Sequence, residues 1–198
     1  MALPPEYLRL ISREELNALP VLRYTGVVLL VESPEQIERA AADILGESAV
    51  GFDTETRPAF RKGESHLPSL AQVATARAVY LFPLQRLDCS GLLSELLGAP
   101  HIVNAGIALA DDLRQLQRLF AFEAAAALDL GAVARRHGLR QTGLRNLAGL
   151  FLGARIAKGT KTTNWAARRL TAQQVAYAAT DAWACRELYV RFRELRLL

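Results

Sequence analysis

Two acidic residues lie two positions apart at the end of one predicted strand, a spacing that suits a shared cation. Residues 49–55 alternate in character, so that Val50 and Phe52 point to one side and Asp53 and Glu55 to the other. The two carboxylates therefore lie side by side, and two such like charges need a cation. Taken alone, Asp-Thr-Glu fits an exposed strand end equally well, so the pair needs partners elsewhere in the chain.

A second acidic pair, Asp111-Asp112, lies near the start of a helix predicted over 109–120. The apolar residues of this segment recur at helical spacing: Leu109, Leu113, Leu116 and Phe120. Asp112 borders that stripe, whereas Asp111 lies nearly opposite it and faces water. Asp112 is therefore placed to reach a neighbouring sheet, while Asp111 suits the positive end of the helix dipole. The alternative is that both residues only decorate a helix end.

The third pair, Tyr177 and Asp181, is spaced four residues apart in a predicted helix. Their Cβ atoms are expected to lie about 5–6 Å apart on one face. Ala184 and Leu188 continue that face, which also fits an ordinary amphipathic helix. An aspartate at the border of an apolar stripe is costly, however, unless it is paired or binds a metal.

Together these positions predict a metal site, provided that both helices pack beside the acidic face of strand 49–55. Four carboxylates without a histidine or cysteine cluster are typical ligands of Mg²⁺ or Mn²⁺ rather than of zinc. Two such metals about 3.5–4 Å apart suit the in-line displacement at a phosphodiester. The chemistry favoured by the residues is phosphodiester cleavage.

The elements that must position these residues alternate between strands and helices in the first part of the chain. Strands are predicted over 25–31, 49–55, 69–75, 79–82 and 102–104. Helices are predicted over 34–45, 88–97 and 109–120, and most of the chain after residue 129 is expected to be helical. Strands 49–55, 69–75 and 79–82 are expected to form an antiparallel meander.

The composition fits one globular domain. The chain has 198 residues, of which 51% are apolar and 22% charged. No apolar run reaches the roughly 20 residues of a membrane-spanning helix, and the N-terminus does not resemble a secretory signal. Cys89 and Cys185 have no metal-ligand spacing and fit buried, reduced thiols. We therefore expect a cytoplasmic protein without a membrane partner.

The positive charge lies in the second half of the chain. Residues 1–100 hold 9 Lys and Arg against 13 Asp and Glu, a net charge of −4, whereas residues 101–198 hold 15 against 7, a net charge of +8. Nine cations and no carboxylate lie between Asp129 and Asp181. A solvated helical surface would explain such a run, but beside the carboxylate set it favours a polyanionic partner.

Three ordered motifs carry a family resemblance: VGFDTETRP, VNAGIALADDLRQL and TNWAARRLTAQQVAYAATDAWACREL. Over residues 25–195 the sequence resembles the 3′-5′ exonucleases of the ribonuclease H-like (DnaQ-like) fold, in the tyrosine (DEDDy) branch of ribonuclease D and the Werner syndrome helicase exonuclease. The resemblance implies an α/β fold whose mixed sheet has antiparallel first three strands, flanking helices and a helical C-terminal half. It divides the chain into an N-terminal extension, 1–24, and an exonuclease domain, 25–198, which we expect to stand alone.

The resemblance also implies residue roles. Asp53, Glu55, Asp112 and Asp181 take the metal-binding and catalytic roles with two divalent cations, Mg²⁺ or Mn²⁺, and Tyr177 orients the attacking water. The implied reaction releases nucleoside 5′-monophosphates from the 3′ end of single-stranded DNA or RNA. The family's path for the substrate strand matches residues after the first motif and before the last helix: Thr56, Arg57, Phe60, Lys62, Lys158, Lys161, Asn164 and Arg168.

Among these path residues we predict nucleic-acid contact for Thr56, Arg57, Lys158, Lys161 and Arg168. Trp165 and Trp183 are interpreted as core residues. Two other classes remain open at this point: a catalytically attenuated nucleic-acid-binding module on the same fold, and an endonuclease or other phosphodiesterase.

Overall fold

The computed structural model describes residues 3–59, 61, 63–157 and 163–198. Its α-helices are α1 (Arg13–Ala18), α2 (Pro34–Ile44), α3 (Ser90–Gly98), α4 (Leu109–Leu116), α5 (Leu130–Arg136), α6 (Leu144–Leu147) and α7 (Ala172–Glu194). Its strands are β1 (Val21–Leu22), β2 (Val27–Leu30), β3 (Ala49–Thr56), β4 (Pro68–Ala74), β5 (Ala78–Pro83), β6 (Val103–Gly106), β7 (Ala127–Asp129) and β8 (Arg155–Ile156). A 3₁₀ turn, Pro5–Tyr7, and a π-helical turn, Ala148–Leu152, complete the described elements.

A six-stranded mixed sheet lies at the centre, in the order β2-β5-β4-β3-β6-β7. Strands β3, β4 and β5 form the predicted antiparallel meander. β2 joins β5 in parallel, and β6 and β7 extend the sheet in parallel on the other side of β3. The α/β fold class and the antiparallel arrangement of these three strands are thus confirmed.

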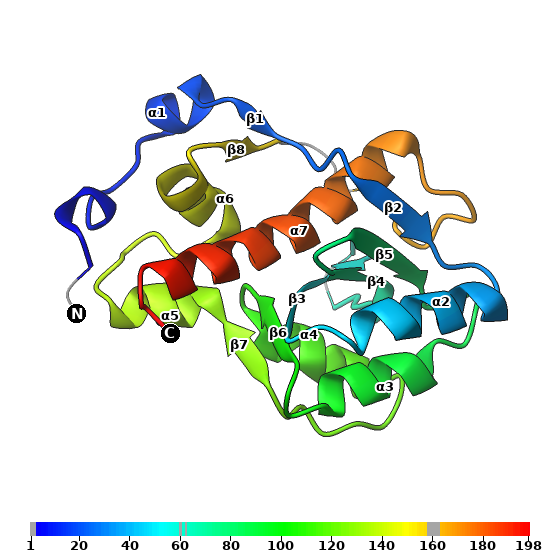
Figure 1. Cartoon of the computed structure of the whole chain (residues 1–198). Helices are drawn as coiled ribbons and strands as arrows, with labels where there is room; N and C mark the ends of the chain where they lie inside the picture. The colour runs from blue at the N-terminus through cyan, green and yellow to red at the C-terminus, as the bar shows by residue number, and fades with distance from the viewer. Residues whose placement is uncertain (1–2, 60, 62, 158–162) are drawn as a thin grey trace.

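Helices cover both faces of the sheet (Figure 1). Helices α2, α3 and α4 pack with Val50, Phe52 and Val73 in one apolar core. The long helix α7 crosses the opposite face, where Ala178 and Ala182 pack against side chains of β4 and β5. The alternation of β3 therefore directs its apolar residues toward the first core and its acidic residues toward α7.

The first described residues fold back over the C-terminal half. β1 pairs in parallel with β8, outside the main sheet (Figure 1). Tyr7 stacks on Phe151 with 4.6 Å between ring centroids, and the backbone nitrogen of Ile11 donates to Gln141 Oε1 at 2.8 Å. The N-terminal segment is thus part of the packed molecule.

The chain after residue 129 is mostly helical in its described residues, as predicted, with α5, α6 and α7 as its α-helices, but some details differ from the prediction. It contains the two-residue strand β8 and the π-helical turn, and β7 precedes it at the sheet edge. Helix α4 also ends at Leu116 rather than 120, because the chain turns there and Phe120 packs against Phe122. Such short elements depend on pairing with distant segments, and this pairing cannot be predicted from local periodicity.

Two smaller predictions can be compared with the structure. No helix of the described residues is both long enough and apolar enough to cross a membrane. Cys89 and Cys185 are buried free thiols, as expected. Burial raises the pKa of the Cys89 thiol to about 11, so this thiol stays protonated near neutral pH.

Candidate active site

Three of the predicted carboxylates meet between β3 and α7. Asp53, Glu55 and Asp181 each offer an oxygen, and these oxygens lie within 4.8 Å of one another. β3 contributes the first two, and α7 brings the third from 126 residues further along the chain. Glu55 and Asp181 are only 8% and 5% exposed. The convergence predicted from sequence therefore occurs for this acidic cluster.

Gly51 allows α7 to approach β3 closely enough to form the cluster. A Cβ atom at Gly51 would lie 1.9 Å from the carbonyl oxygen of Ala182 and 2.8 Å from the backbone nitrogen of Arg186. The backbone of α7 thus rests directly on β3 at this glycine. Because Asp181 precedes Ala182, this contact sets the distance between Asp181 and Asp53.

Asp112 lies beside the acidic cluster rather than within it. Its Oδ1 accepts a hydrogen bond of 2.5 Å from the Thr54 hydroxyl. Thr54 alternates with Asp53 and Glu55, so its side chain leaves β3 on the opposite face. Asp112 is partly buried, as predicted, whereas Asp111 is exposed and pairs with Arg114.

Thr54 is a site residue that the sequence analysis did not single out. Its position in the sequence could have indicated this role. Thr54 lies between two candidate ligands on a strand whose alternate side chains point to the other face of the sheet. Its hydroxyl can donate while both neighbouring carboxylates can only accept, which fixes one oxygen of Asp112.

The electrostatics of the acidic cluster disfavour full ionisation without a cation. Burial and then the negative charges of Asp181, Glu55 and Asp112 raise the pKa of Asp53 well above its ordinary value. Burial also raises the pKa of Asp112, although the hydrogen bond from Thr54 opposes that shift. A bound cation would reverse the repulsion among these groups.

The phenol of Tyr177 faces the same negative charge. Burial first, then the charge of Asp181 and a hydrogen bond to it, raise the pKa of Tyr177. The hydroxyl therefore stays protonated at neutral pH and is able to donate a hydrogen bond. Tyr177 and Asp181 lie four residues apart on α7, as predicted.

The donor set of the acidic cluster fits a hard divalent cation. All three groups are carboxylates, which are the ligands that Mg²⁺ and Mn²⁺ prefer, whereas zinc prefers nitrogen and sulfur. The only thiol in the neighbourhood among the described residues is Cys185, which is buried, and whose pKa is raised by burial and by the nearby aspartates. A protonated thiol is a poor ligand.

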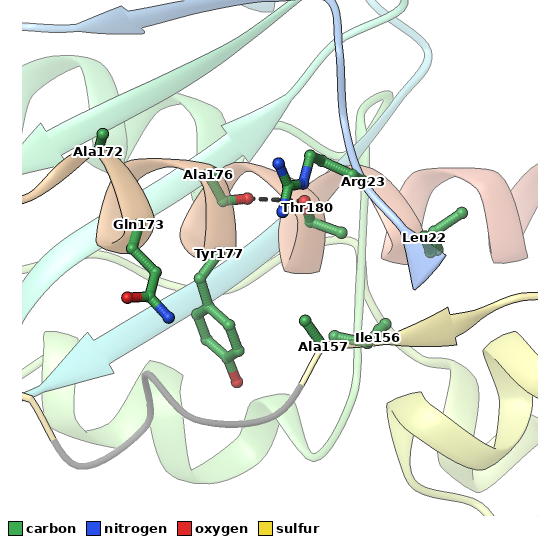
Figure 2. A pocket seen from close by; sticks show the side chains of 9 residues that line it. All are labelled: Leu22, Arg23, Ile156, Ala157, Ala172, Gln173, Ala176, Tyr177 and Thr180. Atoms are coloured by element: carbon green, nitrogen blue, oxygen red, sulfur yellow. Dashed lines mark hydrogen bonds between the residues drawn. The ribbon is translucent and has the colours of Figure 1, made fainter. Parts of the chain in front are cut away.

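A pocket of about 320 Å³ adjoins Tyr177 on the flank of α7 (Figure 2). Three segments line it: β1 with the residue after it, the end of β8 with the residue after it, and the first half of α7. The lining residues are Leu22, Arg23, Ile156, Ala157, Ala172, Gln173, Ala176, Tyr177 and Thr180. In Figure 2 the Gln173 and Tyr177 side chains leave α7 on the same side.

The residues predicted to contact nucleic acid are only partly described. Thr56 ends β3 and is half-buried, while Arg57 and Arg168 are exposed. Lys158 and Lys161 lie outside the described residues, as do Phe60 and Lys62 of the matching stretches. The described residues of this group flank the acidic cluster in sequence, and their nucleic-acid contacts stay predictions.

The two tryptophans differ in burial. Trp165 is 2% exposed and packs near Tyr177, with ring centroids 6.1 Å apart, so its interpretation as a core residue is confirmed. Trp183 is partly buried and packs against Tyr24, with 5.5 Å between ring centroids.

The mixed sheet, the helices on both faces and the acidic cluster between β3 and α7 are those of a ribonuclease H-like nuclease fold. Residues 28–195 match the family of 3′-5′ exonuclease domains, and the chain belongs to that family. The matched region is that of a 3′-5′ exonuclease domain and includes β3, α4 and α7.

Individual relatives agree with this assignment. The human exonuclease mut-7 homolog is 30% identical over 202 residues, covering 86% of this chain and 23% of that protein. Ribonuclease D of Haemophilus influenzae is 33% identical over 147 residues, covering 72% of this chain and 36% of that protein. The chain thus spans well under half the length of either relative.

A solved structure shows the same fold. The crystal structure of the Aedes aegypti Nibbler EXO domain matches with a TM-score of 0.79 and 24% identity. The match covers 90% of this chain and 92% of that domain. The fold expected from the three sequence motifs is thereby confirmed.

Proposed function

We propose that this domain removes nucleotides one at a time from the 3′ end of single-stranded DNA or RNA, with two divalent cations, Mg²⁺ or Mn²⁺, as cofactors. The observation that carries the proposal is the acidic cluster, in which three carboxylates from distant segments place their oxygens within 4.8 Å of one another. Like charges held this close favour either a protonated carboxyl or a bound cation, and three carboxylate ligands suit a hard divalent cation.

The residues of the cluster divide the chemical work. We assign Asp53, Glu55 and Asp181 as the residues that would hold one cation, and Asp53 with Asp112 as those that would hold a second. When bound, the cations supply a water of lowered pKa and neutralise the charge that develops on the leaving 3′-oxygen. The Thr54 hydroxyl holds the Asp112 carboxylate in a single orientation for this role.

Tyr177 has the role of orienting the attacking water. Its hydroxyl stays protonated because burial and Asp181 raise its pKa, so once a cation engages Asp181 the single phenolic proton can be donated to the attacking water. This assignment places the domain in the tyrosine branch of the family. The products are nucleoside 5′-monophosphates and a strand shortened by one residue with a 3′-hydroxyl.

The test uses matched single-stranded DNA and RNA oligonucleotides labelled at the 5′ end, with Mg²⁺ or Mn²⁺. A ladder of products shortened from the 3′ end, lost in Asp53→Asn, is the expected result. Cleavage of a circular single strand would instead indicate an endonuclease. Tight binding without shortening under either metal would overturn the proposal in favour of a binding module.

A further inference from the structure

The N-terminal segment holds an arginine at the pocket beside Tyr177. Leu22 pairs with Ile156 in the short β1–β8 sheet. On the other side of Arg23, the backbone nitrogen of Tyr24 donates to the Thr180 hydroxyl on α7 at 3.1 Å. Arg23 is thus anchored through both chain neighbours, one to β8 and one to α7, and its side chain lines the pocket (Figure 2).

The Thr180 anchor is itself fixed. Its hydroxyl donates to the carbonyl oxygen of Ala176 at 2.6 Å, as the dashed line in Figure 2 marks. The same oxygen is therefore oriented to accept from Tyr24. Thr180 lies between Tyr177 and Asp181 in sequence, so the anchor ties residues 22–24 to the part of α7 that carries the site.

The pocket has the chemistry of a nucleotide site. Arg23 is exposed and forms no ion pair with any residue that the structure describes. Gln173 and Tyr177 add hydrogen-bonding groups, while Leu22 and Ile156 contribute apolar surface. No carboxylate is among the lining residues. A guanidinium suits a phosphate, and an apolar wall suits the face of a base.

We propose that Arg23 binds one backbone phosphate of the substrate strand, upstream of the terminal nucleotide. The inference rests on the proposed function, because the pocket would bind part of the same strand that Tyr177 and the acidic cluster act on. It also assigns the N-terminal segment a role in substrate binding, through a residue that precedes the region matched by the family, 28–195.

The first experiment measures binding of a fluorescein-labelled single-stranded oligonucleotide by anisotropy, with Asp53→Asn as the background so that the strand stays intact. Arg23→Ala is expected to weaken binding about 10-fold. It should also reduce the slope of log affinity against log salt by the contribution of about one phosphate. Arg23→Lys should recover part of the affinity. Arg39→Ala, which removes an exposed arginine from α2, is the matched control and should bind as the parent does.

A second experiment locates the phosphate. Oligonucleotides with a single neutral methylphosphonate at each of the last four linkages are compared on the parent and on Arg23→Ala. At one linkage, the methylphosphonate should weaken binding to the parent and leave binding to the Arg23→Ala protein unchanged. Equal losses for both proteins at every linkage would overturn the inference, as would identical binding by Arg23→Ala and Arg39→Ala. Either outcome leaves the exonuclease proposal intact. That proposal is tested separately, by whether the unmodified protein shortens strands from the 3′ end.

Gln72 lies directly opposite Asp53 in the β3–β4 register. Residues opposed across antiparallel strands project to the same face, with Cβ atoms about 4.5–5.5 Å apart. Gln72 is fully buried, and neither its amide nitrogen nor its amide oxygen has a hydrogen-bond partner among the described residues. A buried amide without partners is unusual in a folded protein.

We infer that Gln72 is a positioning residue for the cation ligands, donating an amide hydrogen to the Asp53 carboxylate once a cation is bound. Carboxylates that bind metals are generally held by such hydrogen bonds. This inference also rests on the proposed function.

The test compares Gln72→Met with Leu70→Met, a control on the same face of β4 opposite Glu55. Titration of Mn²⁺, followed by electron paramagnetic resonance, should show 10- to 100-fold weaker binding for Gln72→Met only. The melting temperature without metal should not fall, since the lost amide had no partner there. Unchanged Mn²⁺ affinity with a lower melting temperature would indicate a merely structural role and overturn the inference.

Discussion

At the scale of single residues, the ionisation of the Asp53 carboxyl links the stability of the folded protein to the proposed metal binding. In an unfolded chain its carboxyl ionises near pH 4, but in the folded protein burial and three negative neighbours raise its pKa. As pH rises from about 4 toward neutrality, the folded state without metal therefore loses stability relative to the unfolded chain. Asp53→Asn removes this penalty, and we expect it to stabilise the metal-free protein at pH 7 by about 1 kcal/mol or more.

The same substitution removes a ligand of the proposed cation site. Asp53→Asn should therefore also lose most of the rise in melting temperature that Mg²⁺ or Mn²⁺ gives the unmodified protein. Thermal melts at pH 5 and pH 7, with and without metal, measure both effects. A variant less stable than the parent at pH 7 without metal would contradict the expectation that the buried Asp53 carboxyl destabilises the metal-free protein.

A substitution at Tyr177 distinguishes a role in the chemical step from a role in metal binding. Replacing it with phenylalanine keeps the ring in the core beside Trp165 and removes only the hydroxyl. We expect kcat to fall about 100-fold, within the range for a group that positions a proton-bearing reactant, with little change in KM. The Mn²⁺-induced rise in melting temperature should persist. A loss of that rise would mean that Tyr177 supports the cation site itself.

At the scale of elements, the contact between β3 and α7 sets the geometry of the site. Gly51→Ala places a methyl group where the carbonyl oxygen of Ala182 now lies. Helix α7 must then shift, at a cost of about 1–3 kcal/mol or more, and Asp181 moves with it. Denaturant unfolding and Mn²⁺ titration should both show losses.

Gly91 offers a matched control for this effect. It lies in α3, and a Cβ there would meet no atom within 4 Å. Gly91→Ala should therefore stabilise the protein by about 0.5–1 kcal/mol through helix propensity, with unchanged Mn²⁺ affinity. If Gly51→Ala behaved in the same way, the close approach of α7 would not be what holds the acidic cluster together.

The sequence predicted β3 and its acidic face because alternation is a local property of eight residues. It predicted the face of α7 that carries Tyr177 and Asp181 for the same reason. The roles of Gly51, Gln72 and Arg23 could not be predicted in this way. Each depends on which distant segment lies opposite, and a glycine, a lone glutamine or an arginine carries no periodic signal of its own.

At the scale of the whole molecule, the acidic half and the basic half of the chain meet at the site. The first half provides β3 with Asp53 and Glu55, and the second half provides α7 and the exposed Arg168 before it. The N-terminal segment then returns to this junction through the β1–β8 pair. We expect a polyanionic strand that reaches this junction to contact Arg23 and Arg168, near the acidic cluster that we propose binds metal.

This arrangement predicts binding that depends strongly on salt. If three phosphates of a single strand are neutralised, each contributes a slope of about −0.7 in log affinity against log salt, and raising salt from 50 to 200 mM weakens binding about 20-fold. Anisotropy on the Asp53→Asn protein measures this slope, and kcat of the unmodified protein at saturating strand should change little. A slope near zero would show that the strand is held by base contacts rather than by the arginines and lysines of the second half.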